Sequence, residues 1–253
     1  MSKVLLINPS YEPTYGGTKG GITNPIYPTQ GLAAIAAVAL QSGHDVEIFD
    51  LSWRPYRPAM IQDKIREVKP DLIGITATTP LMNQLRDISV IAKDISKDIR
   101  VVGGGAHLSA LPMESLAESM LDAVFTDEAD YSFTNYLEAT DPADVKGIYY
   151  REHLDGEIYS TGRGELINNL DDLPIPAWHL YDPADYHRVS RLLVKRTPVA
   201  TAEFSRGCVF KCDFCGSKTT MGLGYRKKSP ERCAEEVEVL QSLGYREFWL
   251  TDD

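Results

Sequence analysis

The 253-residue sequence has no cysteine before position 208, no long apolar run and no recognisable targeting segment. A secreted disulfide scaffold needs cysteines spread along the chain, so that class of protein is excluded. The longest apolar run, Leu32 to Leu40, is far shorter than the ~20 residues of a membrane-spanning helix. Met1 to Ile7 runs directly into a strand pattern without signal-peptide features. These absences predict a cytoplasmic protein with no membrane span.

Positive charge is also scarce, since 26 Lys and Arg residues stand against 36 Asp and Glu residues, for a formal net charge of −10. This balance argues against a nucleic-acid partner. Residues 187–228 are the exception, with ten basic and two acidic residues, a net of +8 that leaves −18 (16 basic, 34 acidic) elsewhere. The segment is either a solvated basic surface or a site that receives a carboxylate or phosphate. The second interpretation favours an anionic small-molecule substrate.

Two nucleotide-binding motifs are missing. The sequence contains no Walker A motif. The run from Gly103 to Leu108, GGGAHL, has Leu108 where the dinucleotide fingerprint needs a third glycine, which disfavours NAD binding.

The first 140 residues alternate between short apolar segments and segments of helical periodicity. We predict strands at 4–7, 46–49, 72–76, 100–102 and 123–126. Thr29 is predicted to cap an alanine-rich helix that ends at Ser42, before Gly43. Right-handed crossovers place helices on both faces of such a sheet. The sequence therefore predicts an α/β fold that begins with a doubly wound, Rossmann-like parallel sheet of about five strands.

Ligands of doubly wound sheets bind beyond the carboxyl ends of the strands. The segments predicted there are small, glycine-rich and hydroxyl-rich, as a surface must be when backbone approaches a large ligand closely. The candidate ligand-binding residues at this edge are Asn8, Ser10, Gly16, Gly17, Thr76, Thr78, Gly104, Gly105, Ala106 and Glu128.

A hairpin is predicted after this sheet, because Val145 to Tyr150 and Glu157 to Ser160 flank the turn signal Asp155-Gly156. An extended linker that packs through Ile175 and Trp178 should follow. From Pro198 onward a strand, a helix that starts at Ser229-Pro230 and a second strand form one βαβ unit. One such unit cannot close a barrel, so we expect the chain to be the front part of a longer protein. The predicted division is 1–140, 141–182 (hairpin and linker) and 183–253.

Three of the four cysteines lie on one loop, at Cys208-x3-Cys212-x2-Cys215. Clustered thiolates hold soft metals or iron–sulfur clusters, and three of them leave a fourth coordination position for another ligand. The alternative is a zinc site completed by Cys233. Cys233 is in line with Val237 and Leu240 at i, i+4 and i+7, which instead favours a place in the helix core.

The cysteine loop, placed after a strand and before a helix, resembles the signature of the radical S-adenosylmethionine (SAM) enzymes. Together with the N-terminal sheet, the chain resembles the subgroup whose SAM barrel follows a cobalamin (B12)-binding domain. The resemblance implies that residues 183–253 are the start of an incomplete radical SAM (β/α) barrel. It implies three cofactors: a [4Fe–4S] cluster, SAM and cobalamin.

Residue by residue, the resemblance assigns the cluster to Cys208, Cys212 and Cys215, with SAM on the fourth iron. Phe214 matches the aromatic position near the adenine, and Asp252 and Asp253 match polar positions that help hold SAM. The edge residues of the N-terminal sheet become the expected cobalamin contacts.

The implied activity is reductive cleavage of SAM to a 5′-deoxyadenosyl radical, supplied with electrons by a donor such as flavodoxin or ferredoxin. Methyl transfer to an unactivated substrate carbon is the expected outcome, and a radical cyclisation or rearrangement is the alternative. A third possibility is that the N-terminal sheet is a cofactor-free docking module. This fragment alone is expected to be inactive.

Two departures from the family pattern concern cobalamin. The sequence has no Asp-x-His-x-x-Gly run, so cobalamin should bind base-off without a histidine ligand, and neither His44 nor His107 has the flanking residues. Residues 126–130 read TDEAD where relatives show Gly-Glu-Gly-Glu, and the missing glycines are expected to crowd the nucleotide tail. A methylthiotransferase is disfavoured because no cysteine lies upstream of Cys208.

Overall fold

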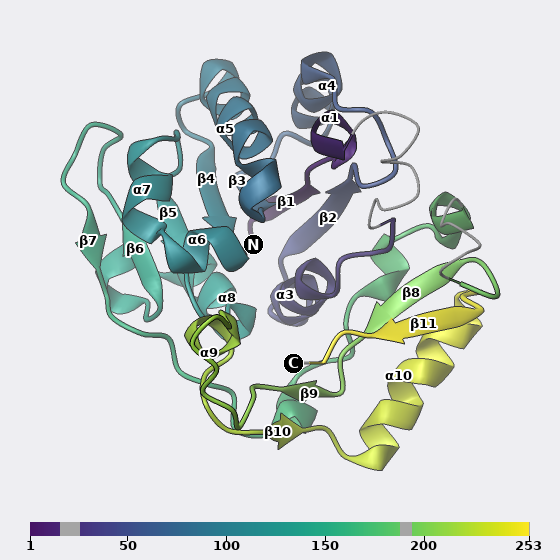
Figure 1. Cartoon of the computed structure of the whole chain (residues 1–253). Helices are drawn as coiled ribbons and strands as arrows, with labels where there is room; N and C mark the ends of the chain where they lie inside the picture. The colour runs from purple at the N-terminus through teal and green to yellow at the C-terminus, as the bar shows by residue number, and fades with distance from the viewer. Residues whose placement is uncertain (16–25, 188–193, 253) are drawn as a thin grey trace.

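A computed structural model of the chain describes residues 1–15, 26–187 and 194–252. Gly16, Gly17 and Asp253, three of the predicted site residues, lie outside the described residues. A larger α/β part built around one sheet fills the first two thirds of the chain, and a smaller part lies against it (Figure 1).

The central sheet has seven strands in the order β2-β1-β3-β4-β5-β6-β7. The first five pair in parallel and the last two antiparallel, which confirms both the doubly wound sheet and the hairpin. The hairpin joins this same sheet beside β5. The strands are β1 Lys3–Asn8, β2 Asp45–Asp50, β3 Leu72–Thr76, β4 Arg100–Gly104, β5 Ala123–Phe125, β6 Ile148–Tyr150 and β7 Tyr159–Ser160.

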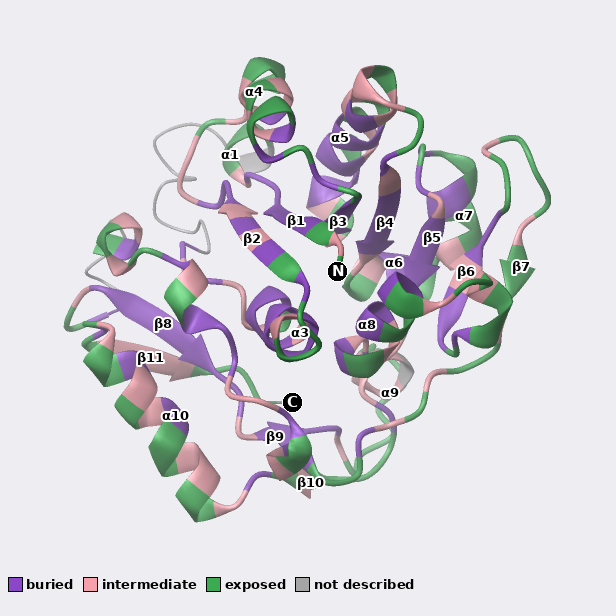
Figure 2. Cartoon of the chain, turned by 180° about the vertical axis from the view of Figure 1, so that it is seen from behind, coloured by how far each residue is buried: buried purple, intermediate pink, exposed green. Residues whose placement is uncertain are grey.

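Alternate residues of β1 serve opposite faces of the sheet, as strand geometry requires. Val4 and Leu6 belong to a core shared with α3 (Gln30–Gln41) and α8 (Asp130–Glu138). Leu5 and Ile7 belong to a second core shared with α4 (Pro58–Val68) and α5 (Met82–Ile95). Figure 2 shows the central strands buried between these two helix layers. The remaining helices of this part are α1 Glu12–Tyr15, α6 Ala106–Ala110 and α7 Pro112–Ala117.

The predicted ends of α3 are half correct. Gly43 has a positive φ of 82° and ends the helix as expected. Thr29 makes no side-chain cap, so that prediction is wrong. Its carbonyl oxygen accepts hydrogen bonds from the Ala33 N–H and the Tyr181 hydroxyl, both at 3.1 Å. The linker packs against the start of the helix, and Tyr181 binds the Thr29 backbone and not its side chain.

The linker crosses α3 and the end of β2. Trp178 is buried, while Ile175 is partly exposed. The Tyr186 hydroxyl donates to the buried Asp50 carboxylate at 2.5 Å. Burial raises the pKa of Asp50, although its hydrogen bonds, first among them that of Tyr186, act in the opposite direction. The described linker residues hold two short 3-10 helices, η3 Leu170–Asp172 and η4 Trp178–Leu180, and η5 Pro183–His187 follows directly after them. Two others lie earlier in the chain, at η1 Thr79–Leu81 and η2 Pro142–Asp144.

The smaller part contains the predicted βαβ unit. Strands β8 (Val199–Ala202) and β11 (Glu247–Leu250) pair in parallel, and α10 (Pro230–Ser242) connects them. The Ser229 hydroxyl caps α10 by accepting from the Arg232 N–H at 3.1 Å. Between β8 and α10 the chain forms a second small pair, β9 (Ser205–Arg206) with β10 (Arg226–Lys227), and the short α9 (Ser217–Thr220).

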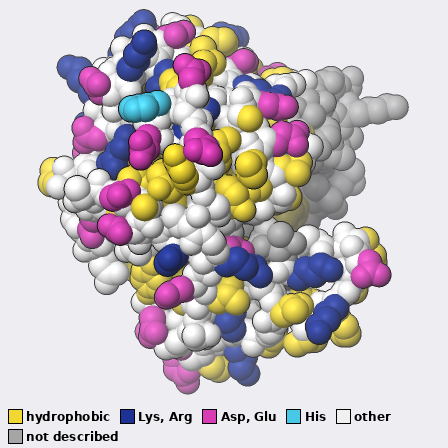
Figure 3. Space-filling view, turned by 90° about the vertical axis from the view of Figure 1, so that its left-hand side faces the viewer, with side chains coloured by type: hydrophobic (Ala, Val, Ile, Leu, Met, Phe, Trp, Pro, Cys, Tyr) yellow, Lys and Arg dark blue, Asp and Glu magenta, His cyan; other side chains and the backbone are white. Residues whose placement is uncertain are grey.

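Among the described residues, no helix is both long enough and apolar enough to cross a bilayer. On the face shown in Figure 3, acidic and basic side chains are intermingled with hydrophobic groups. The described residues on that face therefore form no broad surface of a single charge.

Candidate functional site

A cavity of about 180 Å³ lies at the carboxyl edge of the sheet. The strand order changes direction between β1 and β3, and this switch point is where doubly wound sheets bind ligands. The cavity is comparable to a ~150 Å³ apolar protein cavity that binds benzene, so it can take one aromatic ring system. Its walls come from β1, β3, β4, the start of α3, the loop between β5 and α8, and the smaller part of the chain.

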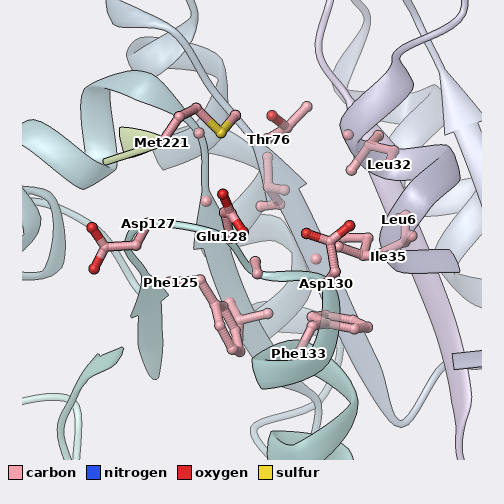
Figure 4. A pocket seen from close by; sticks show the side chains of 18 of the residues that line it. Leu6, Leu32, Ile35, Thr76, Phe125, Asp127, Glu128, Asp130, Phe133 and Met221 are labelled. Carbon is pink, nitrogen blue, oxygen red and sulfur yellow. The ribbon is translucent and has the colours of Figure 1, made fainter. Parts of the chain in front are cut away.

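Most of the lining is apolar. Leu6, Leu32 and Ile35 form one side (Figure 4). Phe125 and Phe133 form one end, with ring centroids 5.7 Å apart. A flat, apolar group is the ligand that such walls accommodate.

Glycines leave room in the cavity. A Cβ added to Gly31 would meet no atom within 4 Å, and one added to Gly104 would meet only Phe125, at 3.9 Å. The neighbouring glycines are needed for packing instead. A Cβ on Gly103 would lie 2.5 Å from Leu108, and Gly105 has a φ of +107°.

Thr76, Gly104, Gly105 and Glu128 are the predicted edge residues that line the cavity. Four others lie elsewhere in the described residues. Ala106 begins α6 and is exposed, and Thr78 lies 3.1 Å from the Tyr11 hydroxyl.

Asn8 and Ser10 are buried in contacts within the sheet and its loops. The Asn8 amide donates to Asp50 at 2.8 Å, and the Ser10 hydroxyl donates to the Arg54 carbonyl at 2.6 Å. The Ser10 N–H donates to Gln84 at 3.0 Å. Their polar groups therefore fix the loop after β1 and do not face the cavity.

The acidic run after β5 divides into two directions. Asp127 has a positive φ of 58°, the conformation that a glycine would adopt freely, and its carboxylate turns outward to Arg163 at 2.8 Å. Glu128 and Asp130 turn inward and line the cavity (Figure 4). The departure from the family pattern is thus accommodated at 127 by left-handed backbone.

Arg206 of β9 meets the inward carboxylates. Its guanidinium donates to both oxygens of Asp130, at 2.7 and 3.0 Å, and its Nε donates to Glu203 at 2.5 Å. Burial alone would lower the pKa of Arg206, but the carboxylates of Asp130 and Glu203 outweigh it and raise that pKa. Burial also raises the pKa of Glu203, against the opposing effect of Arg206.

A second arginine, Arg226 of β10, binds Glu128. Its Nη1 donates to Glu128 Oε2 at 2.9 Å and to the Ile167 carbonyl at 2.7 Å, and its Nη2 donates to the Met221 carbonyl at 2.7 Å. The Ile167 N–H also donates to Glu128, at 2.9 Å. We call the five side chains Glu128, Asp130, Glu203, Arg206 and Arg226 the buried charge network.

Three basic residues of segment 187–228 thus form ion pairs inside the fold. Arg206 and Arg226 belong to the buried charge network, and Lys228 makes a buried ion pair with Glu236 at 2.7 Å. For these three residues, the interpretation as a solvated surface is wrong, because they form ion pairs inside the fold, and Arg206 also lines the cavity. In the sequence, the only sign of these ion pairs was the excess of basic residues in this segment. Their acidic partners, Asp130 and Glu128, lie about 75–100 positions earlier in the chain.

The cysteine loop directly follows Arg206. Gly207 has a φ of +81°, and an added Cβ would collide with the Gly224 carbonyl oxygen, so only glycine fits. Cys208 and Cys215 are partly exposed, Cys212 is exposed, and all are free thiols. After the loop, α9 contacts α6, which follows β4. The loop therefore lies next to the edge of the sheet that carries the cavity.

The donor set of this loop suits a soft metal centre, because three reduced, accessible thiols lie within eight residues. In the described part of the chain, however, no three Cys, His, Asp or Glu side chains converge closely enough to hold a metal ion. Cys233 lies apart on α10 and is partly buried, while Glu236 and Leu240 are the buried positions of that helix. The prediction that Cys233 lies in the helix core is therefore wrong, because its thiol is only partly buried.

Of the predicted SAM residues, Phe214 lies within the loop and Asp252 lies beside its start. Phe214 is 93% exposed, so its ring is free to contact a ligand. The Asp252 carboxylate accepts from the Phe204 N–H at 2.7 Å and the Ser205 hydroxyl at 2.9 Å. Asp252 thus holds the turn between β8 and β9, immediately before Arg206 and the cysteines.

Comparisons with known proteins agree with this arrangement. The family model for the B12 binding domain matches residues 23–137. An uncharacterised methyltransferase of Pyrococcus horikoshii is 32% identical over 99% of this chain and 53% of its own length. The anaerobic magnesium-protoporphyrin IX monomethyl ester cyclase of Rubrivivax gelatinosus is 30% identical over 94% of this chain and 42% of its own length. The chain thus spans about half the length of these relatives.

Solved structures share the fold. The radical SAM methyltransferase TsrM from Kitasatospora setae superposes with a TM-score of 0.75 and 18% identity, over 99% of this chain and 47% of that one. The cobalamin-dependent radical SAM enzyme OxsB superposes with a TM-score of 0.77 and 18% identity, over 100% of this chain and 34% of that one. In both, the match runs through the sheet, the linker and the βαβ unit.

Proposed function

Because the chain belongs to the radical SAM proteins that carry an N-terminal B12-binding domain, we propose that it supplies the cobalamin site and the cluster loop of a cobalamin-dependent radical SAM methyltransferase. The observation that carries the proposal is the position of the cysteine loop. It lies against the same sheet edge as the cavity, joined to it through Arg206 and the contact between α9 and α6.

The cavity suits the aromatic base of the cobalamin nucleotide tail. Gly31 and Gly104 leave open space, and Phe125 and Phe133 offer a flat apolar wall. Thr76 adds a hydroxyl at the rim. A base held here would be consistent with the predicted base-off binding without a histidine. Cobalamin supplies a carrier for a methyl group when it is bound.

Cys208, Cys212 and Cys215 would hold a [4Fe–4S] cluster once their side chains converge on it. Such a cluster would supply the electron for reductive cleavage of SAM to methionine and the 5′-deoxyadenosyl radical. Phe214 is exposed for contact with the adenine. Asp252 fixes the turn that leads into the loop, and the electrons come from a partner such as flavodoxin or ferredoxin.

A radical cyclisation is the second candidate, favoured by the 30% identity with the R. gelatinosus cyclase. The products of SAM distinguish the candidates. A methyltransferase that uses cobalamin forms both S-adenosylhomocysteine and 5′-deoxyadenosine, whereas a cyclase needs only the second. If the N-terminal sheet is instead a cofactor-free docking module, the protein should retain no cobalamin.

The test uses the protein with whatever sequence follows Asp253 in its gene, purified anaerobically and loaded with iron, sulfide and hydroxocobalamin. Reduction in the presence of SAM should yield both products. The variant with Cys208, Cys212 and Cys215 replaced by Ala should retain cobalamin through gel filtration and form no 5′-deoxyadenosine. Product formation by that variant, or a colourless protein that holds zinc, would refute the cluster assignment.

A further inference from the structure

The buried charge network lies where the two parts of the chain meet. Glu128 and Asp130 belong to the loop and helix that follow β5, whereas Glu203 belongs to the turn before β9, and Arg206 and Arg226 belong to β9 and β10. The side chains of Glu128 and Arg206 are only 0% and 6% exposed. Two cations and three carboxylates thus share a site from which water is largely excluded.

Such a network is a costly way to hold two surfaces together. Desolvation of buried ions cancels much of their attraction, so apolar residues of similar size often stabilise a fold equally well. The charges instead fix an orientation, because the two parallel hydrogen bonds from the planar Arg206 guanidinium can form with only one orientation of the Asp130 carboxylate. The network therefore specifies the relative position of the two parts.

The network also touches both functional elements. Glu203, Arg206 and Met221 line the cavity from the smaller part, and Asp130 starts the helix that carries Phe133. On the other side, Arg206 is separated from Cys208 by Gly207 alone, whose backbone admits no side chain. The Gly207 backbone is packed against the carbonyl oxygens of Gly224 and Met221, so the position of Arg206 restricts the positions open to Cys208, the first predicted cluster ligand.

We propose that Arg206 is a positioning residue that couples ligand binding in the cavity to the cysteine loop through its bidentate contact with Asp130. A ligand in the cavity rests against residues of both parts and thereby favours the closed arrangement of the buried charge network. Linkage makes this reciprocal, so a loaded cluster raises the affinity for cobalamin by the same factor that cobalamin raises the affinity for the cluster. The inference rests on the proposed function, because cobalamin is taken as the ligand.

The experiment measures the dissociation constant of hydroxocobalamin by its absorbance, with and without the reconstituted cluster. In the wild-type protein, the cluster should tighten binding by about fivefold or more, the usual scale of coupling between sites. Arg206→Lys keeps the charge but loses the fork, and Asp130→Asn keeps the shape but loses the charge. In both variants the ratio of the two constants should fall towards one.

Glu236→Gln is the matched control, because it breaks the buried ion pair with Lys228, which lies wholly within the smaller part. It should lower thermal stability as the network variants do, yet keep the wild-type ratio. If Arg206→Lys does not fold, Asp130→Asn gives the result.

The failures are distinguishable. A wild-type protein that binds no cobalamin overturns the proposed function together with the coupling. A protein that binds cobalamin with a ratio of one, or network variants that keep the wild-type ratio, overturns the coupling alone. A ratio that falls equally in Glu236→Gln shows that general destabilisation, and not Arg206, is responsible, and overturns it too.

Discussion

Three consecutive glycines at the end of β4 should respond differently to substitution, and this contrast tests whether the cavity binds cobalamin. At Gly104, an added Cβ would meet only Phe125, at 3.9 and 4.0 Å, and would project beside the open cavity. At Gly103, it would lie 2.5 Å from Leu108 and 2.8 Å from Leu121. The first position has room that a ligand can use, and the second has none.

Gly104→Val should therefore fold and lose the ligand. Replacement of a strand glycine by a compatible residue reduces the entropy of the unfolded chain, so the free energy of unfolding should stay equal or rise by about 0.4–1 kcal/mol. The branched side chain intrudes on a cavity of about 180 Å³. A misfit of about 1–3 kcal/mol, typical of overpacking, raises the dissociation constant for hydroxocobalamin roughly 5- to 150-fold.

Gly103→Ala is the control, and its effects should be reversed. Its methyl group displaces core leucines and should cost about 1–3 kcal/mol of stability. Because Gly103 Cβ points to Leu108 and Leu121, the variant that remains folded should bind hydroxocobalamin with nearly wild-type affinity. Urea unfolding and absorbance titration measure the two quantities. Wild-type affinity in a folded Gly104→Val protein would refute the assignment of the cavity.

Three further predictions concern a buried hydrogen bond, a raised thiol pKa and a strained glycine. Tyr186→Phe removes a donor from the buried Asp50 carboxylate and should lower the free energy of unfolding by about 1–3 kcal/mol; an unchanged urea midpoint would contradict this role. Burial, reinforced by the Glu236 carboxylate, raises the pKa of Cys233, so its thiolate forms at higher pH and its alkylation by iodoacetamide should still accelerate above pH 9.0. A rate that levels off below this pH would be inconsistent with the raised pKa. Gly105→Ala places a side chain at a φ of +107°, with its Cβ 2.7 Å from the Ala77 carbonyl oxygen, so the variant should have a lower melting temperature than the wild type. An equal melting temperature would show that this backbone relaxes freely.

Local patterns determine the parts of the fold that sequence could predict. The apolar strands, the Asp155-Gly156 turn and the Ser229 cap depend on residues close together in the chain, and each is found in the structure. Thr29 had the composition of a cap, but a hydroxyl from the linker, Tyr181, binds its carbonyl oxygen. That contact spans 152 positions and leaves no local trace.

The candidate site was predicted less completely for the same reason. Asn8 and Ser10 have the composition and place of ligand-binding residues, but Asp50 and Gln84 take up their polar groups. The acidic run at 127–130 signalled only a departure from a pattern. Its partner Arg206, 76 positions beyond Asp130, could be recognised as such only once the two parts were packed together.

The most direct test of the account is the metal and cofactor content of one protein preparation. After anaerobic loading and gel filtration, the protein should contain one cobalt and about four irons per chain. Replacement of Cys208, Cys212 and Cys215 by Ala should remove the iron and leave the cobalt. Zinc in place of iron, or iron that persists in the variant, would contradict the cluster loop, and an absence of cobalt from the wild-type protein would contradict the cobalamin site.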